Sequence, residues 1–442
     1  MLWIELIVLL ACIVIGARLG GIALGTVAGI GLAVFVFVFA LPPGGPPPGV
    51  LGMIIAVITA LATMQAAGGL DYLISLAERI MRKRPQYITF IAPVVTYVLV
   101  FASGTTHVIY ALLPVIAEVS RKGNVRPERP LSISVIAGFQ GNIASPISAA
   151  TVAMLGLFAA KGLSLPLLLA ITIPSTFIAI LIGAVSVAWR GKTLEDDAEY
   201  QQRLAKGVVI AAAAEPLKTM SMRNARGSML LFLIGIVVVV LLGIFPGLRP
   251  VYESGSGGFV DTDQVSMGMA IMIVMIAVSG LTMLLFSASP EATLKGTIMR
   301  SGLTAIISIL GVSWLGSSFF EGNRNYIVGE ISGLVQLYPV AFAIGMFVLS
   351  TLLFSQAATV SLLMPVGLAL GLPVHSLIGF YPASNGLFFL PTYGTVLAAV
   401  SFDQTGTTRI GKYLLNHSFM RPGLVTLISA LVIALLLSNV MK

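Results

Sequence analysis

The chain has 442 residues, of which 57% are hydrophobic and only 10% are charged, and its formal net charge is +8. Soluble domains carry about 25% charged residues, so this composition excludes an ordinary soluble protein and indicates an integral membrane protein. The positive charge is better explained by loops that set orientation in a membrane than by nucleic-acid binding. Cys12 is the single cysteine and cannot form an internal disulfide. We expect no removable signal peptide, because the N-terminus has no basic region before its first apolar run.

Long apolar segments follow one another along the whole chain. A helix needs about 20 apolar residues to cross a bilayer, and continuous rather than alternating apolar runs favour helices over barrel strands. We therefore expect an all-α integral membrane protein with broken helices near the membrane centre. The predicted segments are 2–17, 19–40, 50–69, 87–120, 131–160, 163–189, 228–247, 265–287, 301–320, 339–370, 377–400 and 422–440.

Two of these segments, 87–120 and 339–370, are too long for one spanning helix. Small polar residues interrupt them, at Ser103 to His107 and at Ser355 to Thr359. Short loops rich in Lys and Arg stay on the cytoplasmic side, so a segment with basic residues at both ends enters and leaves on the same side. A re-entrant hairpin is therefore favoured over one long helix or two spans. The basic residues that flank 87–120 are Arg79, Arg82, Lys83, Arg84, Arg121, Lys122, Arg126 and Arg129.

The order of segments predicts two repeats of the same plan. Residues 1–189 would hold three spans, the hairpin 87–120, the broken span 131–160 and the span 163–189. Residues 190–227 would form a cytoplasmic polar linker. Residues 228–442 would hold three spans, the hairpin 339–370, the broken span 377–400 and the span 422–440. With this topology both termini lie outside the cell and the repeats are inverted.

Local sequence supports the repeat. The stretch SGTTHVIYALLP, which begins at Ser103, is matched by SQAATVSLLMP, which begins at Ser355. Likewise, Gln140-Gly141 and Asn385-Gly386 each precede a proline, Pro146 or Pro391, inside an apolar segment. We expect each proline at the start of a half-helix, where its missing N–H costs nothing. Inverted repeats with paired interrupted segments are typical of transporters that bind substrate near the membrane midplane.

The four interruptions are the candidate binding site. A helix that begins inside the membrane presents free N–H groups, which attract anions. No Lys or Arg lies in the interruptions, so hydroxyls and amides would hold the ligand, and two matched half-sites suit a small molecule with a carboxylate at each end. Helix packing is the alternative role for any one of these residues. The candidates are Ser103, Gly104, Thr105, Thr106, His107, Asn142, Ser145, Ser355, Gln356, Thr359, Asn385, Gly386, Thr392 and Thr395.

Three charged residues are candidates for gating at the cytoplasmic mouth. Glu78 and Arg82 have the i, i+4 spacing of a helical ion pair, and Arg126 follows the first hairpin. A surface ion pair is the alternative interpretation of Glu78 and Arg82. The chain has no Walker motif, dinucleotide fingerprint, HExxH or Cys/His cluster. We therefore expect no enzyme activity, no cofactor, no metal centre and no nucleic-acid partner.

Long stretches of the chain resemble the Dcu family of anaerobic C4-dicarboxylate transporters. The stretches are IELIVLLACIVIGARLGGIALG, MQAAGGLDYL, RKRPQYITFIAPVVTY, GTTHVIYALLPVIAEV, VRPERP, ASPISAA, LLFSQAATVSLLMP, LPTYGT and DQTGTTRIGKYLLNHSF. The resemblance implies exchange of fumarate, succinate, malate or aspartate across the bacterial inner membrane. It also implies kinship with the ion-transporter superfamily, whose members are homodimers that move one domain like an elevator.

Dicarboxylate transporters of that superfamily carry Ser-Asn-Thr at each hairpin tip. Here the tips read Ser103-Gly104-Thr105 and Ser355-Gln356-Ala357. Because of this departure, the sodium sites of that motif are not carried over to this chain. Sodium- or proton-coupled symport remains an alternative to exchange, since backbone carbonyls at broken helices can bind sodium. A second role beside a membrane sensor, with a sensor kinase as partner, also stays open.

Overall fold

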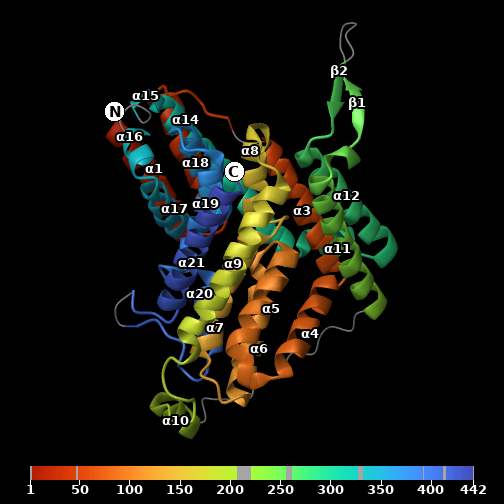
Figure 1. Cartoon of the computed structure of the whole chain (residues 1–442), viewed down its shortest axis with the longest axis vertical. Coiled ribbons are helices and arrows are strands. Elements are labelled where there is room, and N and C mark those ends of the chain that lie inside the picture. The colour runs from red at the N-terminus through yellow and green to blue at the C-terminus, as the bar shows by residue number, and fades with distance from the viewer. Residues whose placement is uncertain are drawn as a thin grey trace.

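The computed structural model describes residues 2–45, 48–206, 221–254, 261–326, 332–391, 393–411 and 415–441. Within these ranges, 8 helices are long and apolar enough to cross a membrane. This confirms the expected all-α membrane fold. Strand β1 (Val251–Ser254) pairs antiparallel with β2 (Asp261–Gln264), with Val251 opposite Gln264, and this small ribbon projects from the top of the molecule in Figure 1.

The first nine helices cover the chain to residue 188. The second helix continues into a π-helical turn at Val34–Val38. The helices are α1 (Leu2–Leu19), α2 (Ala23–Ala33), α3 (Pro48–Ala66), α4 (Gly69–Arg82), α5 (Ile88–Ser103), α6 (Ile109–Lys122), α7 (Glu128–Ala144), α8 (Ala149–Phe158) and α9 (Leu165–Ala188).

The later helices begin in the polar linker. The helices are α10 (Ala198–Ala205), α11 (Met222–Ile244), α12 (Met267–Phe286), α13 (Pro290–Lys295), α14 (Thr297–Gly322), α15 (Arg324–Tyr326), α16 (Ser332–Leu337), α17 (Val340–Leu353), α18 (Gln356–Ala369), α19 (Val374–Phe380), α20 (Gly394–Phe402) and α21 (Met420–Val440). Because α11 begins at Met222, the segment 190–227 overlaps the first turn of a membrane helix. Residues 207–220 of the linker lie outside the described ranges.

The two long apolar segments each form a pair of helices joined by a sharp turn. Gly104, directly after α5, has a φ of +65°, and Phe354, directly after α17, has a φ of +50°. Glycine adopts this left-handed conformation at little cost, whereas a residue with a side chain does not. Thr105 and Ser355 then cap the next helical turn. Thr105, and not Ser103, is therefore the residue of the first hairpin that corresponds to Ser355 of the second.

The chain also breaks between α7 and α8 and between α19 and α20. Ser148 caps α8 by accepting a hydrogen bond from the Thr151 amide at 3.2 Å. Two 3-10 turns, Tyr381–Ser384 and Gly386–Phe388, fill the second break. Pro146 and Pro391 lie before the capping residues of α8 and α20, so the expectation that they begin these helices was wrong. Each proline lies in a turn that precedes the cap.

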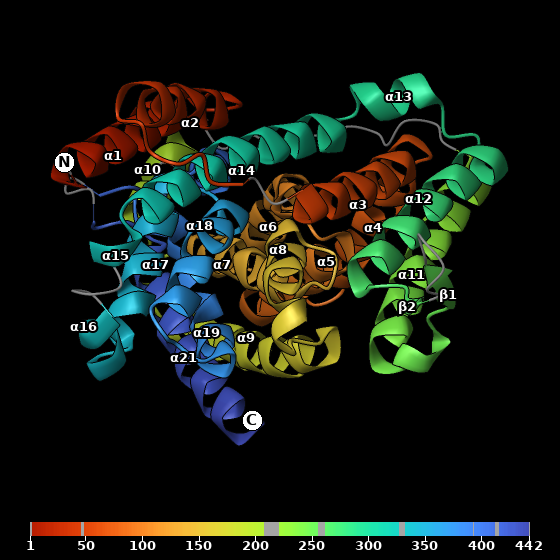
Figure 2. The ribbon, with the colours of Figure 1, turned by 90° about the horizontal axis from the view of Figure 1, so that it is seen from above.

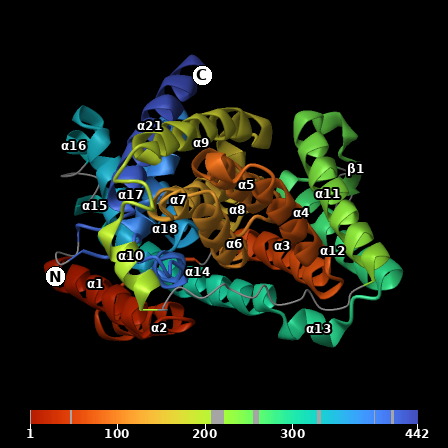
Figure 3. The same ribbon diagram turned by 90° about the horizontal axis from the view of Figure 1, so that it is seen from below.

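The helices pack as two neighbouring groups. Along one edge of Figures 2 and 3, α14 runs beside α2 and reaches toward α3 and α12. The contacts agree, because α14 packs on α2 and α3, and α3 packs on α12. The second group is centred on α7, which contacts both α5 and α9, while α9 contacts α21. We call the first group the wall, and we call the second group, together with the two hairpins α5–α6 and α17–α18, the core.

Candidate functional site

A cavity of about 330 Å³ lies where the two hairpin turns meet the wall. Its largest contribution comes from the residues around Gly104 and Ser355, and Asn142 of α7 adds an amide. No Asp, Glu, Lys or Arg lines it within the described part of the chain. The cavity therefore offers hydroxyl, amide and imidazole groups to a ligand, together with backbone at two hairpin turns.

Half of the candidate site residues line this cavity. They come from both hairpins and from the first broken helix. Two of them, Asn142 and Gln356, are more than 200 residues apart in the chain. His107 is exposed, and its ring stacks on Tyr110 with centroids 6.4 Å apart. The candidates at the cavity are Gly104, Thr105, Thr106, His107, Asn142, Ser355 and Gln356.

Other candidates hold the breaks together from behind the cavity. The Ser145 hydroxyl donates to the Phe101 carbonyl at 2.7 Å, which ties the first break to α5. The Gly386 amide donates to the Ser350 hydroxyl at 2.8 Å, which ties the second break to α17. The two breaks are thus fastened to the hairpin helices by comparable contacts.

The remaining candidates are buried or undescribed. Ser103 is fully buried, and its hydroxyl donates to the carbonyls of Val100 and Thr105 at 3.4 Å. The Thr359 hydroxyl donates to the Ser355 carbonyl at 2.8 Å within α18. Thr395 is 1% exposed, and its hydroxyl has no partner in the described part of the chain. Thr392 lies outside the described residues.

Gln356 fastens the second hairpin to the first half of the chain. Its Oε1 accepts from Asn142 Nδ2 at 2.6 Å, and its Nε2 donates to the Phe139 carbonyl at 3.0 Å and to Asn385 Oδ1. The side chain is only 4% exposed, so these are buried hydrogen bonds. We call Gln356, Asn142, Asn385 and the Phe139 carbonyl the amide clasp. Because the clasp uses both ends of the Gln356 amide, it holds the second turn in place.

The first hairpin reaches the second half of the chain by a smaller contact. Thr106 follows its cap as Gln356 follows Ser355, and the Thr106 hydroxyl is hydrogen-bonded to that of Tyr393. The Tyr393 ring packs edge-on against Phe139, with centroids 5.4 Å apart, and stacks on Phe354 at 6.2 Å. Tyr393 therefore stands between the two turns.

The helix starts at the cavity are partly capped by the protein itself. Thr105 Oγ1 accepts from the His107 amide at 3.4 Å, and Ser355 Oγ accepts from the Ala358 amide at 3.1 Å. Each cap satisfies one of the free N–H groups of a helix start. The positive end of the helix dipole stays at the cavity, so the expected attraction for an anion is retained although fewer amides are free.

The wall side of the cavity was missing from the sequence-based site. It consists of the α1–α2 turn and one face of α14. A helical spacing of small and polar residues in segment 301–320 was the signal that could have revealed this face. The missed wall residues are Gly20, Gly21, Leu24, Ser301, Thr304, Ala305 and Ser308. Phe354 at the second turn and Tyr393 before α20 were also missed.

The gating candidates do not line the cavity: Glu78 and Arg82 lie on α4, and Arg126 precedes α7. Arg82 makes a bidentate ion pair with Glu118 of α6, at 3.0 and 2.9 Å, instead of the expected pair with Glu78. Glu118 also accepts from Lys122 at 2.6 Å. The reason is geometric: α4 packs along α6, which brings Arg82 to a carboxylate on another helix. Glu78 lines a shallow surface hollow with Arg79, Arg82 and Lys83.

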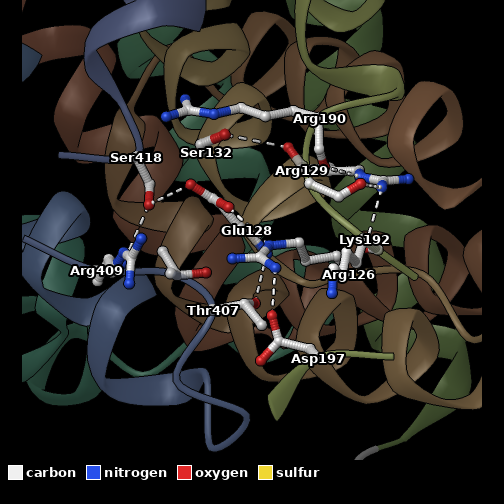
Figure 4. A network of polar contacts seen from close by, with 12 residues as sticks. Arg126, Glu128, Arg129, Ser132, Arg190, Lys192, Asp197, Thr407, Arg409 and Ser418 are labelled. Atoms are coloured by element: carbon white, nitrogen blue, oxygen red, sulfur yellow. Dashed lines mark hydrogen bonds and ion pairs between the residues drawn. The ribbon is translucent and has the colours of Figure 1, made fainter. Parts of the chain in front are cut away.

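Arg126 belongs to a polar network between the linker and both halves of the chain. Figure 4 shows it between Glu128 and Asp197, whose carboxylates accept its bonds at 2.8 and 2.5 Å. Ser418 donates to Glu128 at 2.8 Å from the other half of the chain. Burial raises the pKa of Asp197, but bonds from the Tyr200 amide and Arg126 outweigh this and leave the pKa lowered. The network fastens the linker to the core.

Sequence comparisons find relatives along nearly the whole chain. DcuB of Escherichia coli O6:H1, named an anaerobic C4-dicarboxylate transporter, is 41% identical over 431 residues, which is 96% of this chain and 95% of DcuB. The C4-dicarboxylate transporter DcuA of Wolinella succinogenes is 41% identical over 427 residues, or 97% and 96% of the two chains. DcuA of Escherichia coli K12 is also 41% identical, over 425 residues and 96% of each chain.

A solved structure shares the fold at low sequence identity. The structure of MtrF from Neisseria gonorrhoeae, described as illuminating a class of antimetabolite efflux pumps, matches with a TM-score of 0.52 and 12% identity. The match covers 86% of this chain and 80% of MtrF. At this identity the likeness concerns the fold alone.

Broken helices, hairpin turns and a polar cavity between two helical groups define a multi-pass membrane transporter. The model of the family described as anaerobic C4-dicarboxylate membrane transporters matches residues 1–442. The chain belongs to this family. Its members are membrane transporters and not enzymes, in agreement with the sequence-based expectation.

Proposed function

We propose that this protein exchanges C4-dicarboxylates such as fumarate, succinate, malate and aspartate across the bacterial inner membrane. The observation that carries the proposal is the cavity between the two hairpin turns, which combines hydrogen-bond donors from both halves of the chain without a fixed positive side chain. A dianion needs donors at two ends, and the two turns supply them. The names of the relatives supply the substrate class.

The proposed ligands are the cavity-lining donors of the two turns. Thr105 and Thr106 would serve one carboxylate, with His107 beside them, and Ser355 with Asn142 would serve the other. Helix starts at both turns add partial positive charge without the cost of burying a lysine or arginine. Ser103, Ser145, Thr359, Asn385, Gly386 and Thr395 would keep the breaks in shape.

The proposed movement is elevator-type alternating access, in which the core carries the cavity past the wall. The two-group packing of the helices supports this division. The proposal includes inverted repeats, both termini on the periplasmic side and a homodimeric assembly. A sensor kinase as a regulatory partner is part of the same family-based hypothesis.

The test is uptake of radiolabelled succinate into proteoliposomes preloaded with fumarate, succinate or buffer, with and without sodium. Exchange predicts uptake into preloaded vesicles that does not depend on sodium. Uptake into empty vesicles driven by a sodium or proton gradient would replace exchange by symport. Absence of uptake under every condition, with folded protein, would refute the proposed cargo.

Substitutions at the two turns test the ligand assignment. Thr105→Ala and Ser355→Ala are each expected to raise the half-saturating succinate concentration about tenfold, because a hydrogen bond to a charged group contributes about 1.5 kcal/mol or more. Ser186→Ala is a matched control, since its hydroxyl bonds to the Gly183 carbonyl within α9, away from the cavity. Unchanged saturation in both turn variants would remove these residues from the site.

A further inference from the structure

The wall side of the cavity carries hydroxyl groups that face the hairpin turns. Ser301, Thr304, Ala305 and Ser308 of α14 line it, at the i, i+3, i+4 and i+7 positions of one helix face. The first half of α14 therefore presents a continuous small and polar surface to the same space that Thr105 and Ser355 line. A ligand in this cavity would touch the core on one side and α14 on the other.

Two of these hydroxyls are available to a ligand. The Thr304 hydroxyl donates to the Arg300 carbonyl at 3.0 Å, as threonine often does inside a helix. The hydroxyls of Ser301 and Ser308 make no hydrogen bond within the described part of the chain. Ser308 is only 5% exposed, so its hydroxyl would gain a partner if an acceptor entered the cavity.

The face on α14 is fixed to the wall. A Cβ atom placed on Gly25 of α2 would clash with the Ile307 carbonyl, and one placed on Gly311 would clash with the Gly25 carbonyl. On another side, a Cβ on Gly302 would clash with the Ile58 side chain of α3. The backbones of α14 and α2 approach this closely at Gly25 and Gly311, so α14 is seated directly against α2. The serines must therefore stay with the wall when the core moves.

We propose that Ser301 and Ser308 form a one-sided subsite, in which each serine donates to a different carboxylate of the substrate only while the cavity faces the cytoplasm. This inference rests on the proposed elevator exchange. The serines lie in the half of α14 that follows Lys295 and Arg300, and basic residues mark the cytoplasmic ends of membrane helices. When the core carries the cavity outward, the substrate would leave these serines but keep its contacts with the hairpin turns.

The subsite gives a physical reason for different affinities at the two faces. A ligand can shift an equilibrium between two states only by its difference in affinity for them. Two serine hydroxyls present in one state alone would bind the dianion more tightly from the cytoplasm. They would thereby favour the loaded, inward-facing state without altering the turns that define the substrate.

The experiment measures the half-saturating succinate concentration on each face of the membrane separately. Wild type, Ser301→Ala and Ser308→Ala are compared in right-side-out and inside-out vesicles that hold saturating succinate in the lumen. We expect each variant to raise the half-saturating succinate concentration by about fivefold on the cytoplasmic face, with no change on the outer face. Ser317→Ala is the matched control, because its hydroxyl bonds to the Trp314 carbonyl in the other half of α14.

A binding measurement that does not need transport distinguishes this inference from the proposed function. Cys12 is the single cysteine, so Ser301→Cys in a Cys12→Ala background gives one thiol at the cavity. Succinate is expected to protect this thiol from a maleimide when it is added from the cytoplasmic face. Equal protection or equal affinity changes from both faces would overturn the one-sided subsite, as would no effect or an effect on the outer face alone. Failure of wild-type exchange would refute the transport mechanism instead.

Discussion

The two hairpins resemble each other in outline and differ in how they are held. The second turn is fastened by the amide clasp, in which Gln356 is only 4% exposed. The first turn contacts the second half of the chain through the hydroxyls of Thr106 and Tyr393, and His107 stays exposed. The first hairpin is instead anchored near its base, where Arg82 and Lys122 both bind Glu118.

The turns also differ in backbone strain. Gly104 adopts its positive φ without a side chain in the way, whereas Phe354 adopts a positive φ with a phenyl group attached. A single residue with a side chain in this region costs about 1 kcal/mol, which the surrounding contacts must offset. The clasp and the Phe354–Tyr393 stack supply such contacts. The comparison predicts that the first turn is displaced more easily and that the second is the more rigid.

The largest effect is expected from Gln356→Leu. The substitution removes the clasp and leaves the Asn142 amide nitrogen and the Asn385 amide oxygen without the partner that Gln356 supplied. Unpartnered buried polar groups cost about 1–3 kcal/mol each, so stability should fall by about 3 kcal/mol, measured as a lower midpoint of thermal unfolding in detergent.

A neighbouring glutamine provides the control for this substitution. Gln140 is fully buried on α7, and neither end of its amide has a partner in the described part of the chain. Gln140→Leu makes the same chemical change and is expected to be neutral or stabilising. If both variants lose the same stability, the clasp has no special role in holding the second turn.

The next effect is expected from Gly104→Ala at the first turn. Alanine at a φ of +65° is strained, and its Cβ would lie 2.8 Å from Cγ1 of Ile147. We expect a loss of about 1–2 kcal/mol in stability and slower exchange, measured by thermal unfolding and succinate uptake. The control is Gly345→Ala, because a Cβ at that helical position meets no atom within 4 Å. Equal behaviour of the two variants would mean that the first turn tolerates another backbone shape.

The sequence was sufficient to predict the long apolar helices and the turns at Gly104 and Ser355, but not the contacts between them. The apolar runs and the interruptions at Gly104 and Ser355 follow from local chemistry, so their helices appear where expected. The clasp joins residues more than 200 positions apart, and no local pattern marks Gln356 as the partner of Asn142. Likewise, Arg82 pairs with Glu118 on the neighbouring helix α6, and not with Glu78 at the i, i+4 spacing, because the partner is set by helix packing.

A smaller effect is expected from Thr106→Val. The variant keeps the shape of the side chain and removes the hydroxyl that bonds to Tyr393. One hydrogen bond contributes about 1 kcal/mol, so the midpoint of thermal unfolding should fall less than in Gln356→Leu. Tyr393→Phe tests the pair, because the double variant should lose little more than either single variant. Additive losses would show that the two hydroxyls act independently.

The smallest effect is expected at the base of the first hairpin, from Glu118→Gln. The Arg82 side chain is 35% exposed and that of Glu118 is 14% exposed, so water and salt screen this ion pair. Such pairs contribute about 0.2–1 kcal/mol, and the loss of stability should fall within this range and shrink in high salt. Glu291→Gln is the control, because its pair with Lys295 on α13 is exposed and joins no second helix. A loss at Glu118 as large as that in Gln356→Leu would reverse the comparison, since the first hairpin would then be held as firmly at its base as the second is at its turn.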